Sequence, residues 1–116
     1  MKARVYRNDE VKRVVAFIPR GHAHVRLLLE LEDQAIILSE ATLAAVTRAY
    51  LSVLLHPLRK AVEMRLVRLP ERKALYAEYQ LLETGRGEEE VLAEAEEVWR
   101  SAITGSDGAG CSEHGG

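Results

Sequence analysis

Residues 22–38 of the chain read HAHVRLLLELEDQAIIL, and this stretch decides the fold. Apolar side chains alternate with mostly polar ones through residues 22–32, which is typical of a strand with one buried face. Asp33 and Gln34 then form a tight turn, and residues 35–38 return as the paired strand. The stretch therefore predicts an antiparallel hairpin.

A helix is expected immediately after this hairpin. Ser39 is a suitable N-cap, Glu40 favours the first turn, and Pro57 ends the helix near residue 56. Two apolar stripes predict that the helix is buried on two sides. The stripe expected to pack on the sheet consists of Leu43, Val46, Tyr50, Val53 and Leu54. The second stripe consists of Ala44, Leu51 and Leu55. It is expected to face another subunit; the alternative is that the acidic C-terminal helix covers it with Val91, Val98 and Trp99.

The rest of the chain supplies further strands and a second helix. We expect a short edge strand at 3–7, and two strands at 60–69 and 74–83 joined by a turn at 70–73. The 60–69 strand is expected to point Val62, Met64 and Leu66 inward. Residues 88–103 predict a helix. The inner stripe of that helix consists of Val91, Leu92, Ala95, Val98, Trp99 and Ala102.

Residues 9–18 fit two structures. Their valines and Phe17 favour a strand. The apolar positions nevertheless have helical spacing after Asn8, which slightly favours a helix. With either choice, the element order predicts an α+β fold, with a small antiparallel sheet of about four to five strands and helices packed on one face.

Length and composition indicate one domain at 1–103 and a disordered Gly/Ser-rich tail at 104–116. The single cysteine, Cys111, lies in that tail and excludes an internal disulfide. The chain has no apolar run of the ~18 residues that a membrane span needs. No apolar stretch follows the basic N-terminus, so we expect a cytoplasmic protein.

The charged residues are unevenly distributed. Residues 1–73 hold 14 Lys and Arg against 8 Asp and Glu, a net charge of +6, whereas residues 74–116 hold 2 against 10, a net charge of −8. A basic body with an acidic end predicts a nucleic-acid ligand, a charge-matched partner, or packing of the acidic helix on the protein's own basic surface. Twelve Arg, fifteen Glu and only one Asn also fit a heat-adapted organism, although GC-rich codon usage would raise Arg as well.

Candidate chemical sites are incomplete. His22, His24 and Glu30 would share one face of the 22–32 strand, but two histidines and a distant carboxylate do not close a metal site. The sequence contains no phosphate-binding glycine loop and no nucleophile-elbow motif. We therefore expect no metal, no cofactor and no catalytic residues.

Nucleic-acid binding is the alternative function. Arg4, Arg13, Arg26 and Arg65 are the candidate phosphate-binding residues, because a guanidinium can bind phosphate through two parallel hydrogen bonds. Tyr6 and Tyr76 could stack on bases. Glutamates interrupt every basic strand, which dilutes the positive charge of this surface.

The hairpin at 25–38, VRLLLELEDQAIIL, and the helix at 41–54, ATLAAVTRAYLSVL, resemble the small dimerisation subunit of the KEOPS complex, which modifies a tRNA adenosine beside the anticodon. The resemblance covers residues 3–56. It implies a non-catalytic subunit that dimerises and docks on a catalytic partner. Our leading hypothesis is a non-catalytic oligomerising or complex-forming protein, expected to be a homodimer.

The tail supports a first prediction. Deletion of residues 105–116 should leave the melting temperature nearly unchanged, because the segment has no large apolar residue to anchor it. Differential scanning calorimetry of the full-length and shortened chains provides the measurement. A decrease of several degrees would mean that the tail packs on the domain.

Overall fold

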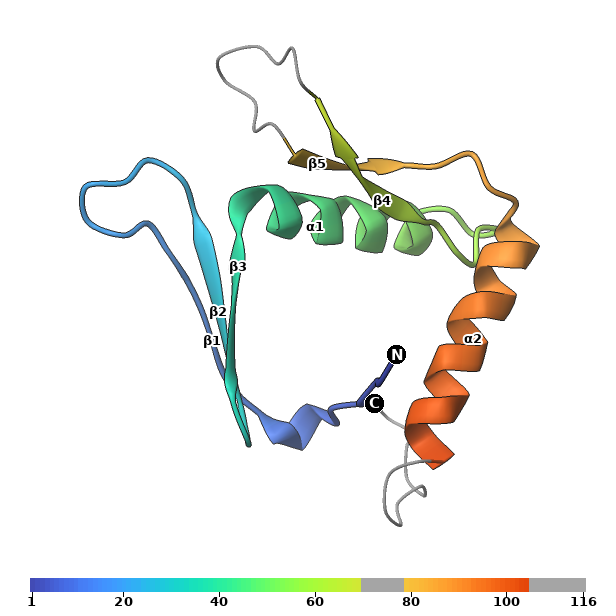
Figure 1. Cartoon of the computed structure of the whole chain (residues 1–116), viewed down its shortest axis with the longest axis horizontal. Coiled ribbons are helices and arrows are strands. Elements are labelled where there is room, and N and C mark those ends of the chain that lie inside the picture. The colour runs from blue at the N-terminus through green and yellow to red at the C-terminus, as the bar shows by residue number, and fades with distance from the viewer. Residues whose placement is uncertain (70–78, 105–116) are drawn as a thin grey trace.

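The computed structural model describes residues 1–69 and 79–104, and its fold is α+β (Figure 1). A 3-10 turn, five strands and two helices follow one another along the chain. The elements are η1 (Asn8–Glu10), β1 (Val11–Phe17), β2 (Arg26–Leu31), β3 (Ala35–Ser39), α1 (Glu40–Leu54), β4 (Met64–Arg68), β5 (Tyr79–Glu83) and α2 (Glu88–Thr104). The predicted turn at 70–73 and the tail at 105–116 lie outside the described residues.

The predicted hairpin is confirmed as β2 and β3, which pair antiparallel around the turn at residues 32–34. The backbone N–H of Leu31 donates to the carbonyl of Gln34 at 2.8 Å and closes that turn. β1 pairs with the other edge of β2, so β2 is the central strand of a three-stranded sheet. Leu31, at the end of this central strand, is one of the few buried side chains.

The slight preference for a helix at 9–18 was wrong. Only one turn of helix forms, η1, and Glu10 caps it by accepting a hydrogen bond from the backbone N–H of Arg7 at 2.9 Å. The chain then continues as β1, with a bulge between Val11 and Arg13. Pairing with β2 satisfies the backbone of the β-branched residues, and this tertiary contact outweighs the local helical spacing.

Two other strand predictions need correction. Residues 3–7 are irregular, and no sheet includes them. The strand predicted at 22–32 begins only at Arg26, because residues 18–25 form a loop with Gly21 at a φ of 82°. A positive φ suits glycine, which has no Cβ to clash with the backbone. His22 and His24 therefore lie in a loop and do not share a strand face.

The described strands form two sheets where a single sheet of four to five strands was expected. β4 and β5 pair only with each other, as a two-stranded sheet. This hairpin lies along α1, on the side away from the opening between the three-stranded sheet and α2 (Figure 1). Its Leu66, predicted to point inward, is 67% exposed. The hairpin therefore covers α1 with one face and leaves its other face uncovered.

The observed packing of α1 differs in part from the expected one. Spacing of three and four residues places Ala45, Arg48 and Ser52 on one side of the helix. Arg48 donates a hydrogen bond at 3.0 Å to the backbone carbonyl of Leu81 in β5, so this side faces the hairpin. Of the stripe expected to pack on the sheet, Val46, Tyr50 and Leu54 are exposed, whereas Leu43 and Val53 are half-buried.

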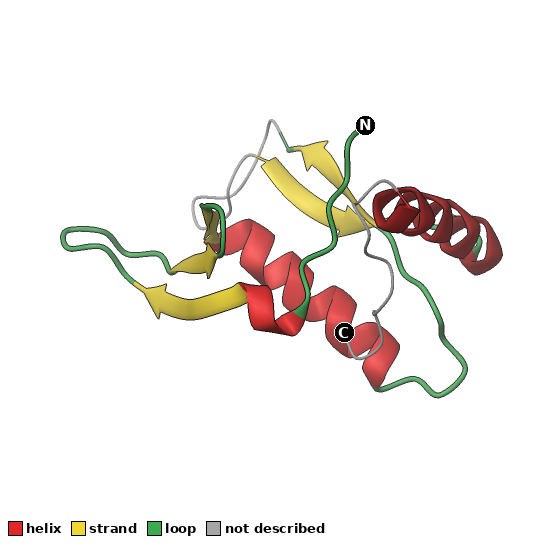
Figure 2. Cartoon of the chain, turned by 90° about the horizontal axis from the view of Figure 1, so that it is seen from below, coloured by secondary structure: helices red, strands yellow, loops and turns green. Residues whose placement is uncertain are grey.

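α2 has the predicted position in the sequence but not the predicted packing. It begins at Glu88 as expected and makes no extensive contact with another described helix or strand. Figure 2 also shows it lying apart from α1. Among the described residues only Leu31, Ala45 and Ala102 are buried. No helix in the described part of the chain is long and apolar enough to cross a membrane.

The burial of Ala45 in α1 supports a second prediction. Ala45 is only 2% exposed, so Ala45→Leu forces three extra carbons into a filled space. Such overpacking should cost about 1–3 kcal/mol in the free energy of unfolding, measured by urea denaturation. Ala93→Leu, the same change at an exposed position of α2, is the matched control and should cost little. Equal effects in the two variants would contradict the packing described here.

Candidate functional site

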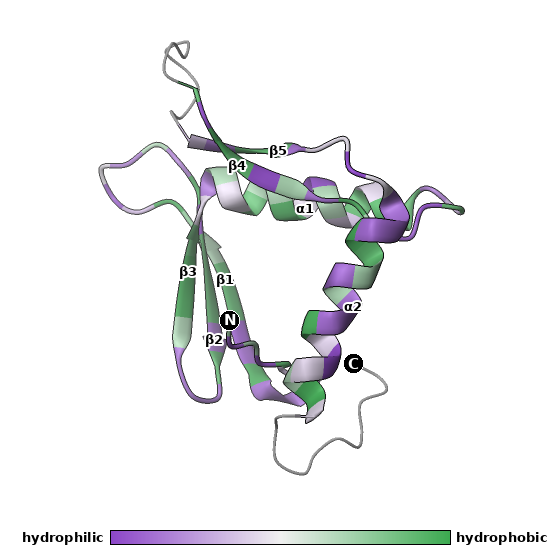
Figure 3. Cartoon of the chain, turned by 45° about the vertical axis from the view of Figure 1, so that its right-hand side comes forward, coloured by the Kyte–Doolittle hydropathy of each residue, from purple (hydrophilic) through white to green (hydrophobic). Residues whose placement is uncertain are grey.

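The most extensive candidate site is the apolar surface of α1 that the hairpin leaves uncovered. Val46, Tyr50 and Leu54 recur every four residues and form one ridge, in which Tyr50 is 63% exposed. We call these three residues the α1 ridge. In Figure 3 the ribbons of the three-stranded sheet are also predominantly hydrophobic. Contiguous exposed apolar surface of this kind marks interaction sites in natural proteins.

The predicted interface residues form a second exposed group beside the ridge. Ala44 is half-buried, whereas Leu51 is exposed and Leu55, at the C-cap of the helix, is 67% exposed. Spacing of three and four residues places Leu51 and Leu55 next to the ridge. The sequence reasoning found this group but assigned the ridge to the interior of the domain. The apolar surface of α1 is therefore wider than expected.

The three-stranded sheet is apolar on both faces. Val14 of β1, Leu29 of β2 and Ile36 of β3 are register partners and share one face. The next row, Val15, Leu28 and Ile37, points to the opposite face. Strands with apolar residues on both faces are typical of sheets that are covered on both sides. Among the described elements α1 provides the main cover of this sheet, and it does so through limited contacts with β2 and β3.

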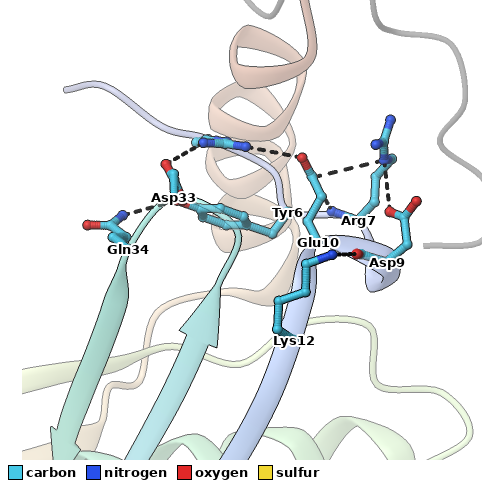
Figure 4. Close-up of polar contacts among 8 residues, drawn as sticks. Tyr6, Arg7, Asp9, Glu10, Lys12, Asp33 and Gln34 are labelled. Carbon is cyan, nitrogen blue, oxygen red and sulfur yellow. Dashed lines mark hydrogen bonds and ion pairs between the residues drawn. The ribbon is translucent and has the colours of Figure 1, made fainter.

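The N-terminal segment docks on the β2–β3 turn through a polar cluster (Figure 4). Arg4 forms ion pairs with Asp33 and, at 3.1 Å, with Glu10. The Tyr6 hydroxyl donates to Asp33 Oδ1 at 3.0 Å and accepts from Gln34 Nε2 at 3.0 Å. The hydrogen bond from the backbone N–H of Arg7 lowers the pKa of Glu10. The cluster explains why residues 4–10 stay beside the sheet without joining it.

The candidate nucleic-acid residues are occupied and separated. Arg13 pairs with Glu30 at 2.8 Å across neighbouring strands, and Arg65 pairs with Glu63 at 3.1 Å in the other sheet. Arg26 donates to the carbonyl of His24 at 3.3 Å. Arg4 and Tyr6 belong to the polar cluster described above, and Tyr76 lies outside the described residues. The structure therefore does not bring these side chains together as one basic surface.

The candidate metal ligands are also separated. His24 Nδ1 lies 3.4 Å from Glu40 Oε1, which accepts a hydrogen bond from the backbone N–H of Val25 at 2.7 Å. Glu30 is engaged by Arg13. Within residues 1–69 and 79–104, no group of three or more His, Cys, Asp or Glu residues is placed to hold a metal ion.

A cavity of about 450 Å³ lies between α1 and the β4–β5 hairpin. Its charged lining residues are Arg48 and Glu83. Arg48 already binds the carbonyl of Leu81, and Glu83 already forms an ion pair with Arg59. Both groups therefore serve the packing of the hairpin on the helix and on the segment that follows it.

Sequence reasoning missed an ionic centre at Arg86. Its guanidinium bonds Glu63 at 2.9 Å, Glu90 at 2.8 Å and Glu94 at 2.6 Å. Thr84 Oγ1 donates to Glu63 at 2.8 Å. The detectable signal was the spacing of Arg86, Glu90 and Glu94, which places all three on one helical side. We call this group the Arg86 hub, because it joins the first turns of α2 to the start of β4.

Interactions within the hub lower the pKa of two of its carboxylates. The hydrogen bonds from Arg86 lower the pKa of Glu94, and those from Thr84 and Arg65, with the charge of Arg86, lower the pKa of Glu63. Both carboxylates have an ordinary value of 4.5. A lowered folded-state pKa means stability that is present above the unfolded value and is lost as the pH falls through the folded value.

The hub supports a third prediction. Arg86→Gln should lower the free energy of unfolding at pH 7 and have a much smaller effect well below pH 4.5, where the carboxylates are protonated. Urea denaturation across this pH range provides the measurement. Arg100→Gln, which removes one exposed ion pair with Glu96, is the matched control. An Arg86→Gln effect that is independent of pH would contradict the ionic role of the hub.

Comparisons with known proteins identify no relative of this chain. No family model matches it, no curated protein matches it, and no solved structure matches it. The interpretation of its function therefore depends on the geometry described above.

Proposed function

We propose that this chain is a non-catalytic protein that associates with itself and uses α1 as the principal contact surface. The observation that carries the proposal is the exposure of both apolar sides of α1, the ridge and the Leu51/Leu55 group. The β4–β5 hairpin covers only the side that carries Ala45 and Arg48. A helix of this composition is normally stabilised by burial of its apolar sides.

The gain from burial decides between a monomer and an assembly. Burial of one large apolar side chain contributes roughly 1.5–3 kcal/mol. Tyr50, Leu54 and Leu55 alone would contribute several kcal/mol if a second subunit covered them. Two-fold association presents the same surface twice, so each favourable contact occurs twice. This doubling favours a homodimer over association with an unrelated partner.

A broader role in a larger complex extends the proposal. The resemblance of residues 3–56 to the KEOPS dimerisation subunit suggests an accessory subunit of an RNA-modification assembly. Direct nucleic-acid binding has less support, because Arg4, Arg13 and Arg65 already pair with carboxylates. An enzymatic role also has less support, since the charged groups of the α1–hairpin cavity are engaged in packing.

The fourth prediction concerns the oligomeric state. Multi-angle light scattering over a range of concentrations should give twice the 13.0 kDa mass of one chain. Tyr50→Glu and Leu55→Glu should weaken the dimer at least about tenfold, because a buried carboxylate is costly to desolvate. Ala23→Glu, the same kind of change at an exposed loop position outside the apolar surface of α1, should leave the mass unchanged.

The controls make the oligomeric test decisive. Circular dichroism must show that the glutamate variants stay folded before their masses are compared. A wild-type monomer at the highest concentration would overturn the proposal. A dimer that tolerates both glutamate variants would place the contact on another surface. If Tyr50→Glu unfolds the chain, the test uses Leu55→Glu alone. Leu55 lies at the end of the helix, where a substitution disturbs the fold less.

A further inference from the structure

α2 is an amphipathic helix to which the other described elements give little cover, although Ala102 near its C-terminal end is buried. Its apolar positions, among them Val91, Ala95, Val98 and Trp99, lie on one side of the helix. Trp99 is 52% exposed and Val98 is 47% exposed. Among the described elements, none makes extensive contact with α2 (Figures 1 and 2). Helices in water depend mainly on packing of such a side, so this stripe requires cover.

The Arg86 hub fixes the direction in which α2 extends from the rest of the chain. Arg86 holds Glu90 and Glu94, and Glu88 Oε2 accepts a hydrogen bond from the backbone N–H of Lys60 at 2.7 Å. All of these contacts lie in the first two turns, and the helix then extends away from α1 (Figure 1). To lie along the α1 ridge of its own chain, α2 would have to turn back at its base and break the hub. A second copy can present its α1 ridge without that cost.

Charge complementarity also favours a second copy. Residues 1–69 hold twelve Lys and Arg against seven Asp and Glu, a net charge of +5. α2 holds six Glu against one Arg, a net charge of −5. Within the described residues, Glu89 and Glu97 of α2 and Lys2 and Lys60 of the body have no ion-pair partner for their side chains. Placing α2 of one copy on the body of another brings these opposite charges together.

We propose that two copies of this chain exchange their α2 helices, so that Val98 and Trp99 of one copy pack against the α1 ridge of the other. This proposal rests on the self-association proposed above and adds to it the identity of the contacting surfaces. The exchange covers the α2 stripe and the α1 ridge together, because each copy supplies one of each. Exchange of a terminal element between identical chains is a known route to a two-fold dimer.

Site-specific crosslinking tests the exchange. Single-cysteine chains Val46→Cys and Val98→Cys are made in a Cys111→Ser background, and one of them carries a mass tag. After mixing and re-equilibration, a short bismaleimide should give the mixed 46–98 dimer as the main product. Replacing Val98→Cys by Ala93→Cys, on the polar side of α2, is the matched control. It should reduce the mixed product at least about tenfold, because position 93 faces away from the stripe.

Each alternative outcome has a distinct meaning. If the same-site 46–46 product dominates, the chain self-associates through α1 alone and the exchange is wrong. If a Val46→Cys/Val98→Cys double variant forms an internally linked monomer, α2 folds back on its own chain and the exchange is wrong. If no crosslinked dimer forms and light scattering shows monomers, the self-association itself fails together with the exchange.

Discussion

The constraint on which the rest of the structure depends is the distribution of apolar residues around α1. The helix carries apolar side chains on most of its circumference, and the described residues cover it with one two-stranded hairpin and with limited contacts from β2 and β3. The covered side uses small residues such as Ala45, which allow close approach. The uncovered sides carry the large ones, Tyr50, Leu54 and Leu55. A domain normally buries its large apolar side chains, and this inverted arrangement is the observation on which the proposed self-association rests.

Ionic contacts hold the remaining elements where a core would otherwise do so. Arg4 and Tyr6 attach the N-terminal segment to the β2–β3 turn, and Arg86 attaches α2 to β4. Both groups are local: they place the end of an element but cover little apolar surface. Surface ion pairs contribute little stability individually, so they orient these elements more than they stabilise them. This explains how α2 can have a defined base and an exposed apolar stripe.

Local patterns predicted the elements well where periodicity and turn signals agreed. The β2–β3 hairpin, α1 and α2 were all predicted within a few residues of their observed ends. At residues 9–18 the two signals disagreed, and strand pairing with β2 decided the outcome. The Arg86 hub was visible only as a helical spacing of Arg86, Glu90 and Glu94. Its third carboxylate, Glu63, immediately precedes the distant strand β4, and no local pattern could have indicated it.

The sequence by itself determined the α+β class, the hairpin followed by a helix, the acidic amphipathic α2 and the apolar character of both sides of α1. These properties follow from residue periodicity and capping, which are local. Only the tertiary structure decided that the strands divide into two sheets and that the hairpin covers the small-residue side of α1. Those choices depend on which surfaces meet, and helical periodicity identifies the sides of a helix without identifying what covers each of them.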